Sequence, residues 1–266
     1  MKKLLFLFCV PLLIVACGKA PAEQASEGNK ASEGNEVVEG YEAGKAVRYE
    51  FDEKRLRCCV VAETPEAPLR EAVGEWLCEV LGGYYEGDVN DLQTMVDFYG
   101  HAMTDTLRKE LVDIRPEAEV AFEATMEKAY ETDVLVTYTY STYYNLGGAH
   151  PTSSEEGATF RKSDGRRLTW DVIRRDRQYQ FSQLLIEHLK DYFGMAENEL
   201  MQVLGEQTYF NPPLPRTPPL FYENGMVFVY QQYEIGSYAM GMPGDTIAYE
   251  RIAPLLTASA RRLVGQ

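Results

Sequence analysis

Two stretches in the middle of this 266-residue chain alternate between apolar and polar residues, and that period of two limits the possible folds more than any other feature. The apolar positions are the even-numbered residues of Val120–Met126 and of Val134–Tyr140. Because successive side chains of a strand point to opposite faces, each stretch predicts a strand with one buried face. The polar segment Tyr130–Asp133 between them predicts a turn, so we expect an antiparallel pair.

Segments with helical periodicity lie on both sides of this pair. Apolar residues recur on one helix face in Leu69–Val80, and Gly82-Gly83 ends that pattern. The other predicted helices are residues 91–112, 176–193, 196–204 and 253–264. The other predicted strands are residues 47–63 with a break at 52–54, 157–161, 167–169, a hairpin at 220–233 around Asn224-Gly225, and 246–252. Since strands and helices come in runs, we predict an α+β fold, with antiparallel β-sheet and helices packed on one face.

The first residues predict export and attachment to a membrane. Met1-Lys2-Lys3 precedes the apolar stretch Leu4–Val15, which is too short to cross a bilayer and is soon followed by Cys17. A cysteine directly after Val-Ala resembles the bacterial lipobox, which predicts removal of residues 1–16 as a signal peptide and lipidation of Cys17. An ordinary signal peptide with an incidental cysteine is the alternative. The lipobox places the protein in a bacterial cell envelope, and Gly18-Lys19 favours the outer membrane because it holds no acidic retention signal.

Composition divides the rest of the chain into a linker and a globular region. Residues 17–45 are rich in Gly, Ala, Ser, Glu and Asn, and Ala25–Lys30 is nearly repeated by Ala31–Glu36. Such a segment buries too little apolar surface to fold, so we expect a flexible tether. Residues 46–266 have the composition of a globular α+β ectodomain, which we expect in two sequential halves of about 46–155 and 156–266.

The charge of the chain limits its partners. The formal net charge is −15, and removal of Lys2 and Lys3 with the signal peptide makes it −17. We expect no binding to nucleic acid, since that affinity depends on Lys and Arg contacts with phosphate. A strongly acidic domain attracts basic partners, although the same charge also serves to keep an envelope protein soluble.

Three cysteines follow Cys17, and they leave the disulfide pattern open. Cys58 and Cys59 are neighbours on a predicted strand, so just one of them can share a face with Cys78. Either one bridge to Cys78 forms, or the thiols stay free and buried as small apolar side chains. Paired Cys or His residues at metal-ligand spacing are absent from the sequence, so we predict no metal site and no cofactor.

Two segments that leave aromatic strands through glycines hold the candidate site: Thr142–Pro151 and Tyr230–Gly241. The candidate ligand-binding residues are Tyr143, Tyr144, Asn145, His150, Tyr233, Glu234 and Tyr238. The tyrosines offer contact area with a polar end, or they belong to the core of a sheet. His150 contacts either a ligand or a neighbouring loop. Glu234 acts either as a general acid, if buried, or as an acceptor for turn amides.

Together the two segments resemble an envelope domain of unknown function. Tyr144–His150 has the pattern Tyr-x-Leu-Gly-Gly-Ala-His, and Tyr233–Gly241 has Tyr-Glu-Ile-x-x-Tyr-Ala-x-Gly. Both are similar to the domain found in the extracellular part of RsiV-type anti-sigma factors and before the catalytic domain of PdaC-type peptidoglycan deacetylases. Ser163–Asp171 also resembles the segment between these motifs. The resemblance covers about Val47 to the end and implies an α+β ectodomain. In RsiV-type members it implies lysozyme binding, while we expect neither a sigma-binding segment nor a deacetylase domain here.

The sequence favours binding over catalysis. It contains no GxSxG, HExxH or phosphate-binding loop, and loose carboxylate pairs mean little among 41 acidic residues. The leading hypothesis is a lipid-anchored envelope binding protein that is not an enzyme and recognises lysozyme or another basic envelope-active protein. The second is a module that binds peptidoglycan or an oligosaccharide through the tyrosine-rich strands and the 145–151 loop. Glycan hydrolysis is the third.

Overall fold

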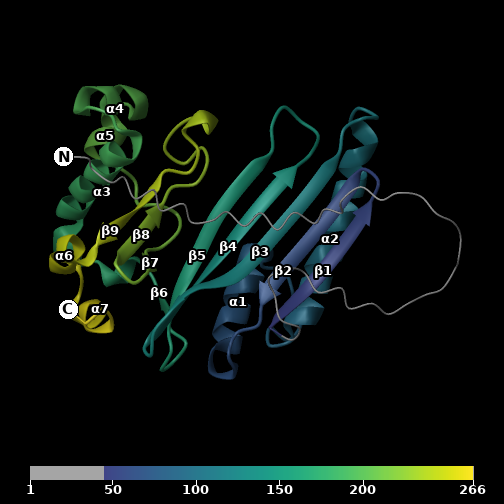
Figure 1. The fold of residues 1–266 in the computed structure, drawn as a ribbon, viewed down its shortest axis with the longest axis horizontal. Coiled ribbons are helices and arrows are strands. Elements are labelled where there is room, and N and C mark those ends of the chain that lie inside the picture. The colour runs from purple at the N-terminus through teal and green to yellow at the C-terminus, as the bar shows by residue number, and fades with distance from the viewer. Residues whose placement is uncertain (1–44, 266) are drawn as a thin grey trace, which may run out of the picture. The chain divides into compact units, whose positions relative to one another are not determined.

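The two alternating stretches lie at the centre of a six-stranded sheet (Figure 1). The computed structural model describes residues 45–265, so the predicted signal peptide, Cys17 and most of the predicted linker lie outside the described residues. The strands of this sheet lie side by side in chain order: β1 (Ala46–Glu53), β2 (Leu56–Glu63), β3 (Val120–Glu131), β4 (Leu135–Asn145), β5 (Thr152–Arg161) and β6 (Arg167–Leu168). A second sheet contains β7 (Leu220–Phe221), β8 (Gly225–Val229) and β9 (Gly244–Ala248).

Neighbouring strands run antiparallel in both sheets, with the exception of β2 and β3, which are parallel. The prediction of antiparallel sheet is therefore confirmed for every pair but one. A parallel pair needs a crossover connection, and α1 (Arg70–Leu81) and α2 (Leu92–Asp113) supply it. Asp91 caps α2 by accepting a hydrogen bond from the Thr94 amide at 3.1 Å.

The main core lies between the six-stranded sheet and these two helices. The apolar even-numbered residues of β2, of β3 as far as Met126 and of β4 point to that face, as their alternation predicts. A bulge between Lys128 and Tyr130 shifts the register at the end of β3. Trp76 of α1 meets Phe160 of β5 edge to face, with ring centroids 6.1 Å apart. Tyr138 and Tyr140 are each 3% exposed, so of the two roles considered for the tyrosines these two take the core.

The second sheet packs against three of the helices that follow β6: α3 (Gln178–Phe193), α6 (Tyr249–Ile252) and α7 (Ala258–Leu263). The other two, α4 (Glu197–Leu204) and α5 (Glu206–Phe210), pack in a separate cluster with α3 and the segment after β8. Phe181 of α3 contacts Phe228 of β8, with ring centroids 5.2 Å apart. Gly194 ends α3 with a left-handed φ of 62°, as predicted from its position. The fold is α+β.

Several element boundaries differ from the prediction. β5 begins at Thr152 rather than at the predicted Gly157. Its first half is polar and shows no apolar alternation, so the sequence pattern did not reveal it. It therefore runs across the expected division at residues 155 and 156, and the change from one sheet to the other falls after β6.

The C-terminal segment is more broken than predicted. The last strand, β9, ends at Ala248, and α6 occupies the rest of the predicted strand. The predicted helix over 253–264 is divided into one turn of 3-10 helix, Ala253–Leu255, and α7. Thr257 caps α7 by accepting from the Ala260 amide at 3.4 Å, so the helix starts anew there. The short helix α5 was not predicted.

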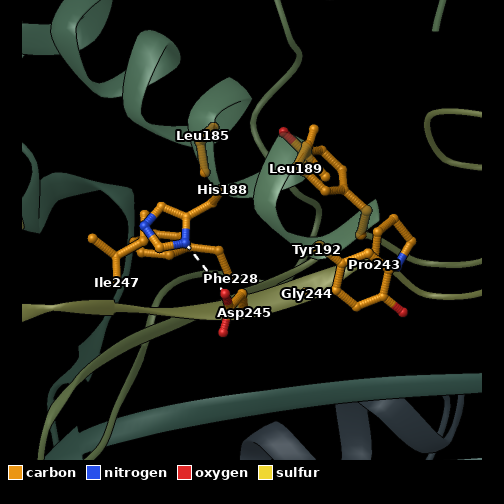
Figure 2. Close-up of a pocket in the computed structure, with 10 residues that line it drawn as sticks. Leu185, His188, Leu189, Tyr192, Phe228, Pro243, Gly244, Asp245 and Ile247 are labelled. Carbon is orange, nitrogen blue, oxygen red and sulfur yellow. Dashed lines mark ion pairs between the residues drawn. The ribbon is translucent and has the colours of Figure 1, made fainter. Parts of the chain in front are cut away.

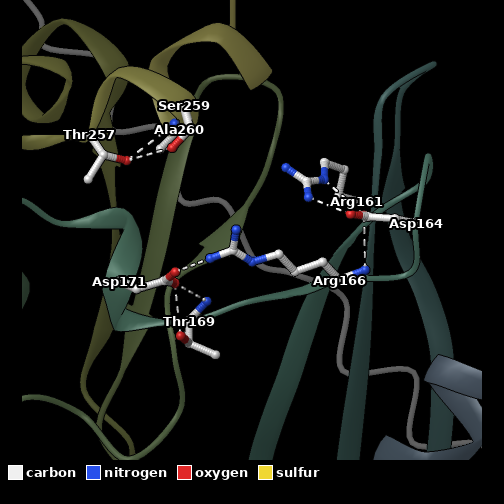
Figure 3. A network of polar contacts seen from close by, with 8 residues as sticks. All are labelled: Arg161, Asp164, Arg166, Thr169, Asp171, Thr257, Ser259 and Ala260. Atoms are coloured by element: carbon white, nitrogen blue, oxygen red, sulfur yellow. Dashed lines mark hydrogen bonds and ion pairs between the residues drawn. The ribbon is translucent and has the colours of Figure 1, made fainter.

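A polar network fixes the turn between β5 and β6 (Figure 3). Arg161 Nε donates to Asp164 at 2.8 Å, and Asp164 also accepts from the Arg166 amide at 3.3 Å. The hydrogen bond from Arg161 lowers the pKa of Asp164 to about 2. Arg166 in turn pairs with Asp171, which accepts from the Thr169 hydroxyl at 2.9 Å. The turn predicted at Ser163-Asp164-Gly165 is confirmed, with Gly165 at a φ of 68°.

All three described cysteines are buried. Cys58 and Cys78 are buried free thiols in the main core. Cys59 is buried on the opposite face of β2, as its neighbouring position requires.

Within residues 45–265, none of the helices combines the length and the apolar character that crossing a bilayer requires.

Two buried threonines join β7 of the second sheet to the first sheet. The Phe221 amide donates to Thr159 Oγ1 at 3.1 Å, and Thr137 Oγ1 donates to the Phe221 carbonyl at 2.7 Å. The two hydroxyl oxygens are 2.8 Å apart. Since Thr137 gives its one proton to the carbonyl, the proton between the hydroxyls comes from Thr159. The three groups form a closed ring of hydrogen bonds, and both threonines are fully buried.

Removing either hydroxyl leaves a buried backbone group of Phe221 unpaired. We expect Thr137→Val and Thr159→Val each to lower the free energy of unfolding by about 1–3 kcal/mol, measured by urea denaturation. The double variant is expected to lose less than the sum, because both changes break the same ring. Thr139→Val, at the next position on this face of β4, is the control. Additive losses would contradict the ring.

Candidate ligand-binding site

Two loops that are far apart in the sequence meet in space and carry three of the candidate residues. His150 lies between β4 and β5, and Tyr233 and Tyr238 lie between β8 and β9. The rings of His150 and Tyr238 stack, with centroids 3.8 Å apart and planes 25° apart. The Tyr233 ring is 5.9 Å from that of Tyr238, and its hydroxyl is 3.5 Å from His150 Nε2. These three residues are named the loop cluster.

Hydrogen bonds assign the proton on the His150 ring. The carbonyl oxygen of Pro151 lies 3.0 Å from His150 Nδ1 and 3.0 Å from the Tyr238 hydroxyl. A carbonyl can only accept, so Nδ1 carries the proton, and Nε2 of the neutral ring is an acceptor that faces the Tyr233 hydroxyl. One carbonyl thus fastens two rings of the cluster, while Tyr233 remains 58% exposed.

Tyr233 projects from a tight turn in a conformation that tyrosine rarely adopts. Its φ is 65°, in the left-handed region, and the Glu234 amide closes the turn by donating to the Gln231 carbonyl at 3.0 Å. The Glu234 carboxylate accepts from the Gln231 amide at 2.7 Å and from the Arg216 amide at 2.6 Å. Glu234 therefore has the second of its two predicted roles, as an acceptor for backbone amides.

The two glutamines before Tyr233 attach this turn to the edge of β5. Gln232 Oε1 accepts from the Ser153 amide at 3.1 Å. Gln231 Oε1 accepts from the Glu155 amide at 3.0 Å, and its Nε2 donates to the Glu155 carbonyl at 2.5 Å. These side chains take the place of a neighbouring strand. These contacts were not predicted, although two adjacent amide side chains directly after a strand were the available signal.

Three candidate residues at the end of β4 lie outside the loop cluster. Tyr144 points to the main core, where its ring meets Phe122 at a centroid distance of 5.8 Å. Burial raises the pKa of Tyr144, and the charge of Glu110 adds to the shift. Asn145 Oδ1 accepts from the Gly147 amide at 2.9 Å, which shapes the start of the loop. Tyr143 points to the opposite face of the sheet from Tyr144.

Tyr143 and Asn145 line a polar hollow of about 280 Å³ at this end of the sheet, with Lys54 and Glu119 among its other walls. Arg55 beside it donates to the carbonyls of two residues in the α2–β3 connection, at 2.6 and 2.7 Å. Small-molecule sites are usually about 300–1,000 Å³ and mostly apolar. This hollow is at the lower limit of that range and is lined by charges of both signs, so it does not define a ligand.

A second hollow lies between α3 and β9 (Figure 2). His188 points toward Asp245 there, with Nδ1 and Oδ2 3.5 Å apart, and Arg251 lies 3.3 Å from His188 Nε2. His188 lowers the pKa of Asp245, against the opposing effect of burial. The cavity volume is about 20 Å³, which is space for about one water molecule. It is therefore too small for a metabolite.

Two adjacent carboxylates of β5 are half-buried, but they do not form a pair. Burial raises the pKa of both Glu155 and Glu156, and the charge of Glu79 adds to the shift of Glu156. Neighbouring residues of a strand point to opposite faces, so the two carboxylates do not face one substrate. Within residues 45–265, no group of three His, Cys, Asp or Glu side chains is arranged to hold a metal ion.

Comparison with known proteins finds a family domain in one part of the chain and solved structures with a similar fold. Residues 171–250 match the family model described as a protein of unknown function, DUF3298. This region holds Tyr233 and Tyr238 of the loop cluster, whereas His150 precedes it. Comparison with the curated proteins gives no match.

Two solved structures of DUF3298 family members resemble this chain. One, from Bacteroides fragilis, is 16% identical, with 83% of this chain and 96% of that chain covered and a TM-score of 0.66. The other, from Pseudomonas aeruginosa, is 15% identical, with 81% and 93% covered and a TM-score of 0.55. At these identities the likeness shows the fold alone, and the relationship to RsiV-type and PdaC-type proteins stays a prediction.

The positive φ of Tyr233 predicts an unusual order of stability. We expect Tyr233→Gly to be more stable than Tyr233→Ala by about 1 kcal/mol, because both lack the ring and only glycine is unstrained there. The same two changes at Tyr238, whose φ is negative, should give the opposite order. Thermal or urea denaturation of the four variants measures this. An alanine variant at 233 that matches the glycine variant would contradict the assigned strain.

The raised pKa of Glu156 predicts a pH dependence. The folded protein holds this proton more tightly than the unfolded chain does, so the charged carboxyl destabilises the fold at neutral pH. We expect Glu156→Gln to raise the free energy of unfolding at pH 7. The gain should shrink as pH falls through the raised pKa toward the ordinary value of 4.5. Glu75→Gln, on an exposed face of α1, is the control, and an equal gain at pH 7 and pH 4 would contradict the assignment.

Proposed function

We propose that this protein is a lipid-anchored binding protein of the bacterial cell envelope, which recognises its ligand at the loop cluster and is not an enzyme. One observation carries the proposal: His150 and Tyr233 are 83 positions apart, yet the fold brings their side chains together on the surface. The two segments that contain them are the ones that carry the resemblance to RsiV-type ectodomains. Cys17, outside the described residues, would supply the anchor.

The form of the loop cluster fits a large ligand. Its rings lie at the surface and neither of the two hollows described above encloses them. Tyrosine and histidine rings give rigid contact area at low conformational entropy, and the Tyr233 hydroxyl adds a polar group. Anchoring of the turn by Gln231 and Glu234 lowers the entropy lost on binding.

A basic protein of the lysozyme class is the ligand we propose. The mature chain has a formal net charge of −17, which favours association with a basic partner. The resemblance to RsiV-type ectodomains points to the same ligand. This attraction must weaken with added salt, because exposed charges are screened.

Calorimetry with lysozyme tests the proposal, using the mature chain kept free of lipid by Cys17→Ser. We expect binding that is tighter at low than at physiological salt. Tyr233→Gly and His150→Ala should each weaken it by about tenfold or more, the loss typical of residues central to an interface. Tyr179→Ala is the control, since Tyr179 is 72% exposed and lies on α3. Absent or salt-independent binding would reject lysozyme as the ligand.

Glycan binding is the second candidate, and the stacked rings of the exposed His150 and the half-buried Tyr238 favour it. Aromatic faces pack against the apolar faces of sugar rings. Retention of the protein on purified peptidoglycan, lost in Tyr238→Ala and kept in Tyr179→Ala, would support this function. Retention that both variants keep would reject the loop cluster as a glycan site.

A further inference from the structure

A second group of exposed rings lies in the connection between α1 and α2. Tyr84 is 56% exposed and Phe98 is 41% exposed, and their ring centroids are 5.6 Å apart with planes at 59°. Tyr85 is half-buried, and its ring centroid lies 5.3 Å from that of Phe98, with the two planes at 53°. These three rings are named the aromatic platform.

The backbone around the platform holds its rings in place. The Tyr99 hydroxyl accepts from the amides of Tyr84 and Tyr85 at 3.0 and 3.1 Å. It also lies 3.3 Å from the Cys78 carbonyl, to which it donates. One buried hydroxyl therefore fixes both tyrosines of the platform to the end of α1.

Two glycines let the tyrosine rings lie directly against the chain. A Cβ on Gly82 would be 2.7 Å from the Tyr84 ring, and a Cβ on Gly87 would be 2.3 Å from the Tyr85 ring. Real Cβ atoms do not approach so closely, so any other residue would move these rings. The platform is thus formed before a ligand arrives, which lowers the entropy lost on binding.

The surroundings of the platform are strongly acidic. Residues 82–101 contain Glu86, Asp88, Asp91 and Asp97 and no Lys or Arg. Hydrogen bonds from Asn90 and from Thr94 lower the pKa values of Asp88 and Asp91, so both stay charged. Burial raises the pKa of Tyr85, and the charges of Asp91 and Asp88 add to the shift. Two cations that contact α1 and α2 already have acidic partners: Arg167 pairs with Glu79 of α1, and Arg48, whose backbone bonds Gln93 of α2, pairs with Glu50.

We propose that the aromatic platform is a second interaction surface, which binds Lys or Arg side chains of a basic protein partner. An aromatic face attracts a cation through its quadrupole, and carboxylates around it add long-range attraction. An apolar partner would be a poor fit, because residues 82–101 add four acidic side chains to these rings and no Lys or Arg. The protein already contains one such contact, since the Arg108 guanidinium lies 4.7 Å from the centroid of the Phe51 ring.

This surface is independent of the loop cluster. It lies in the connection between α1 and α2 and shares no residue with the loop cluster, so the proposal does not rest on the function proposed for the loops. The two sites are separated by experiment, because Tyr233→Gly removes a ring from the loop cluster and leaves the aromatic platform intact.

Octalysine is the probe for this surface, titrated by calorimetry into the mature chain carrying Cys17→Ser at low and physiological salt. We expect Tyr84→Ala and Phe98→Leu each to weaken binding about two- to fivefold, the usual contribution of an exposed cation–π contact. Phe98→Leu keeps an apolar side chain and the net charge, so its effect reports the ring itself. Tyr99→Phe, which keeps all three platform rings, should also weaken binding through its lost amide contacts.

Control variants distinguish octalysine binding at the aromatic platform from general attraction to the net charge of the protein. Tyr179→Ala should leave octalysine affinity unchanged, and circular dichroism should show that every variant is folded. If Tyr84→Ala and Phe98→Leu bind as tightly as the parent, or if Tyr179→Ala is weakened equally, the proposal is overturned and the attraction is a property of the whole acidic surface.

Discussion

The ring of hydrogen bonds among Thr137, Thr159 and Phe221 is the contact on which the rest of the structure depends. It holds β7 against β4 and β5, and β8 and β9 follow β7 in the second sheet. Gly157 makes this approach possible, since a Cβ there would lie 2.8 Å from the Leu220 side chain. This contact and the hydrogen bonds of Gln231 and Gln232 to β5 together place the turn at Tyr233 beside His150.

Glutamine side chains pair with the backbone at the two edges of the first sheet. Both outer edges of a sheet expose unpaired backbone groups, which invite pairing with another chain. Gln231 and Gln232 pair with the edge of β5, and Gln93 of α2 pairs in the same way with the backbone of Arg48 on β1. At β5 this protection has a second effect, because it sets the tight turn that projects Tyr233. The local needs of the sheet and the geometry of the loop cluster are therefore met by the same contacts.

Periodicity was enough to predict the centre of this fold, and tertiary contacts explain what it missed. The strands with one apolar face, β3 and β4, and the helices with a clear stripe, α1 to α4, were predicted because burial alone determines them. The polar half of β5 was missed, since it has no apolar alternation and the groups that pair with its free edge, Gln231 and Gln232, are far away in the sequence. His150, Tyr233 and Tyr238 were predicted as candidates from glycine and aromatic patterns, but no pattern showed that they meet while Tyr143, Tyr144 and Asn145 do not. The aromatic platform was missed because Tyr84 and Tyr85 follow a helix stop and looked like an ordinary loop.

Tyr233 shows why exposed rings in this protein need a functional explanation. A residue that served the fold alone at this turn would be glycine or asparagine, which tolerate a φ of 65°. A tyrosine there adds backbone strain and exposes most of its ring, and neither effect stabilises the folded state. The hydrogen bonds of Glu234, Gln231 and Gln232 instead oppose that strain and keep the ring facing outward beside His150. The proposed ligand contact would account for such an arrangement, which is the reason to seek a ligand at the loop cluster before either hollow.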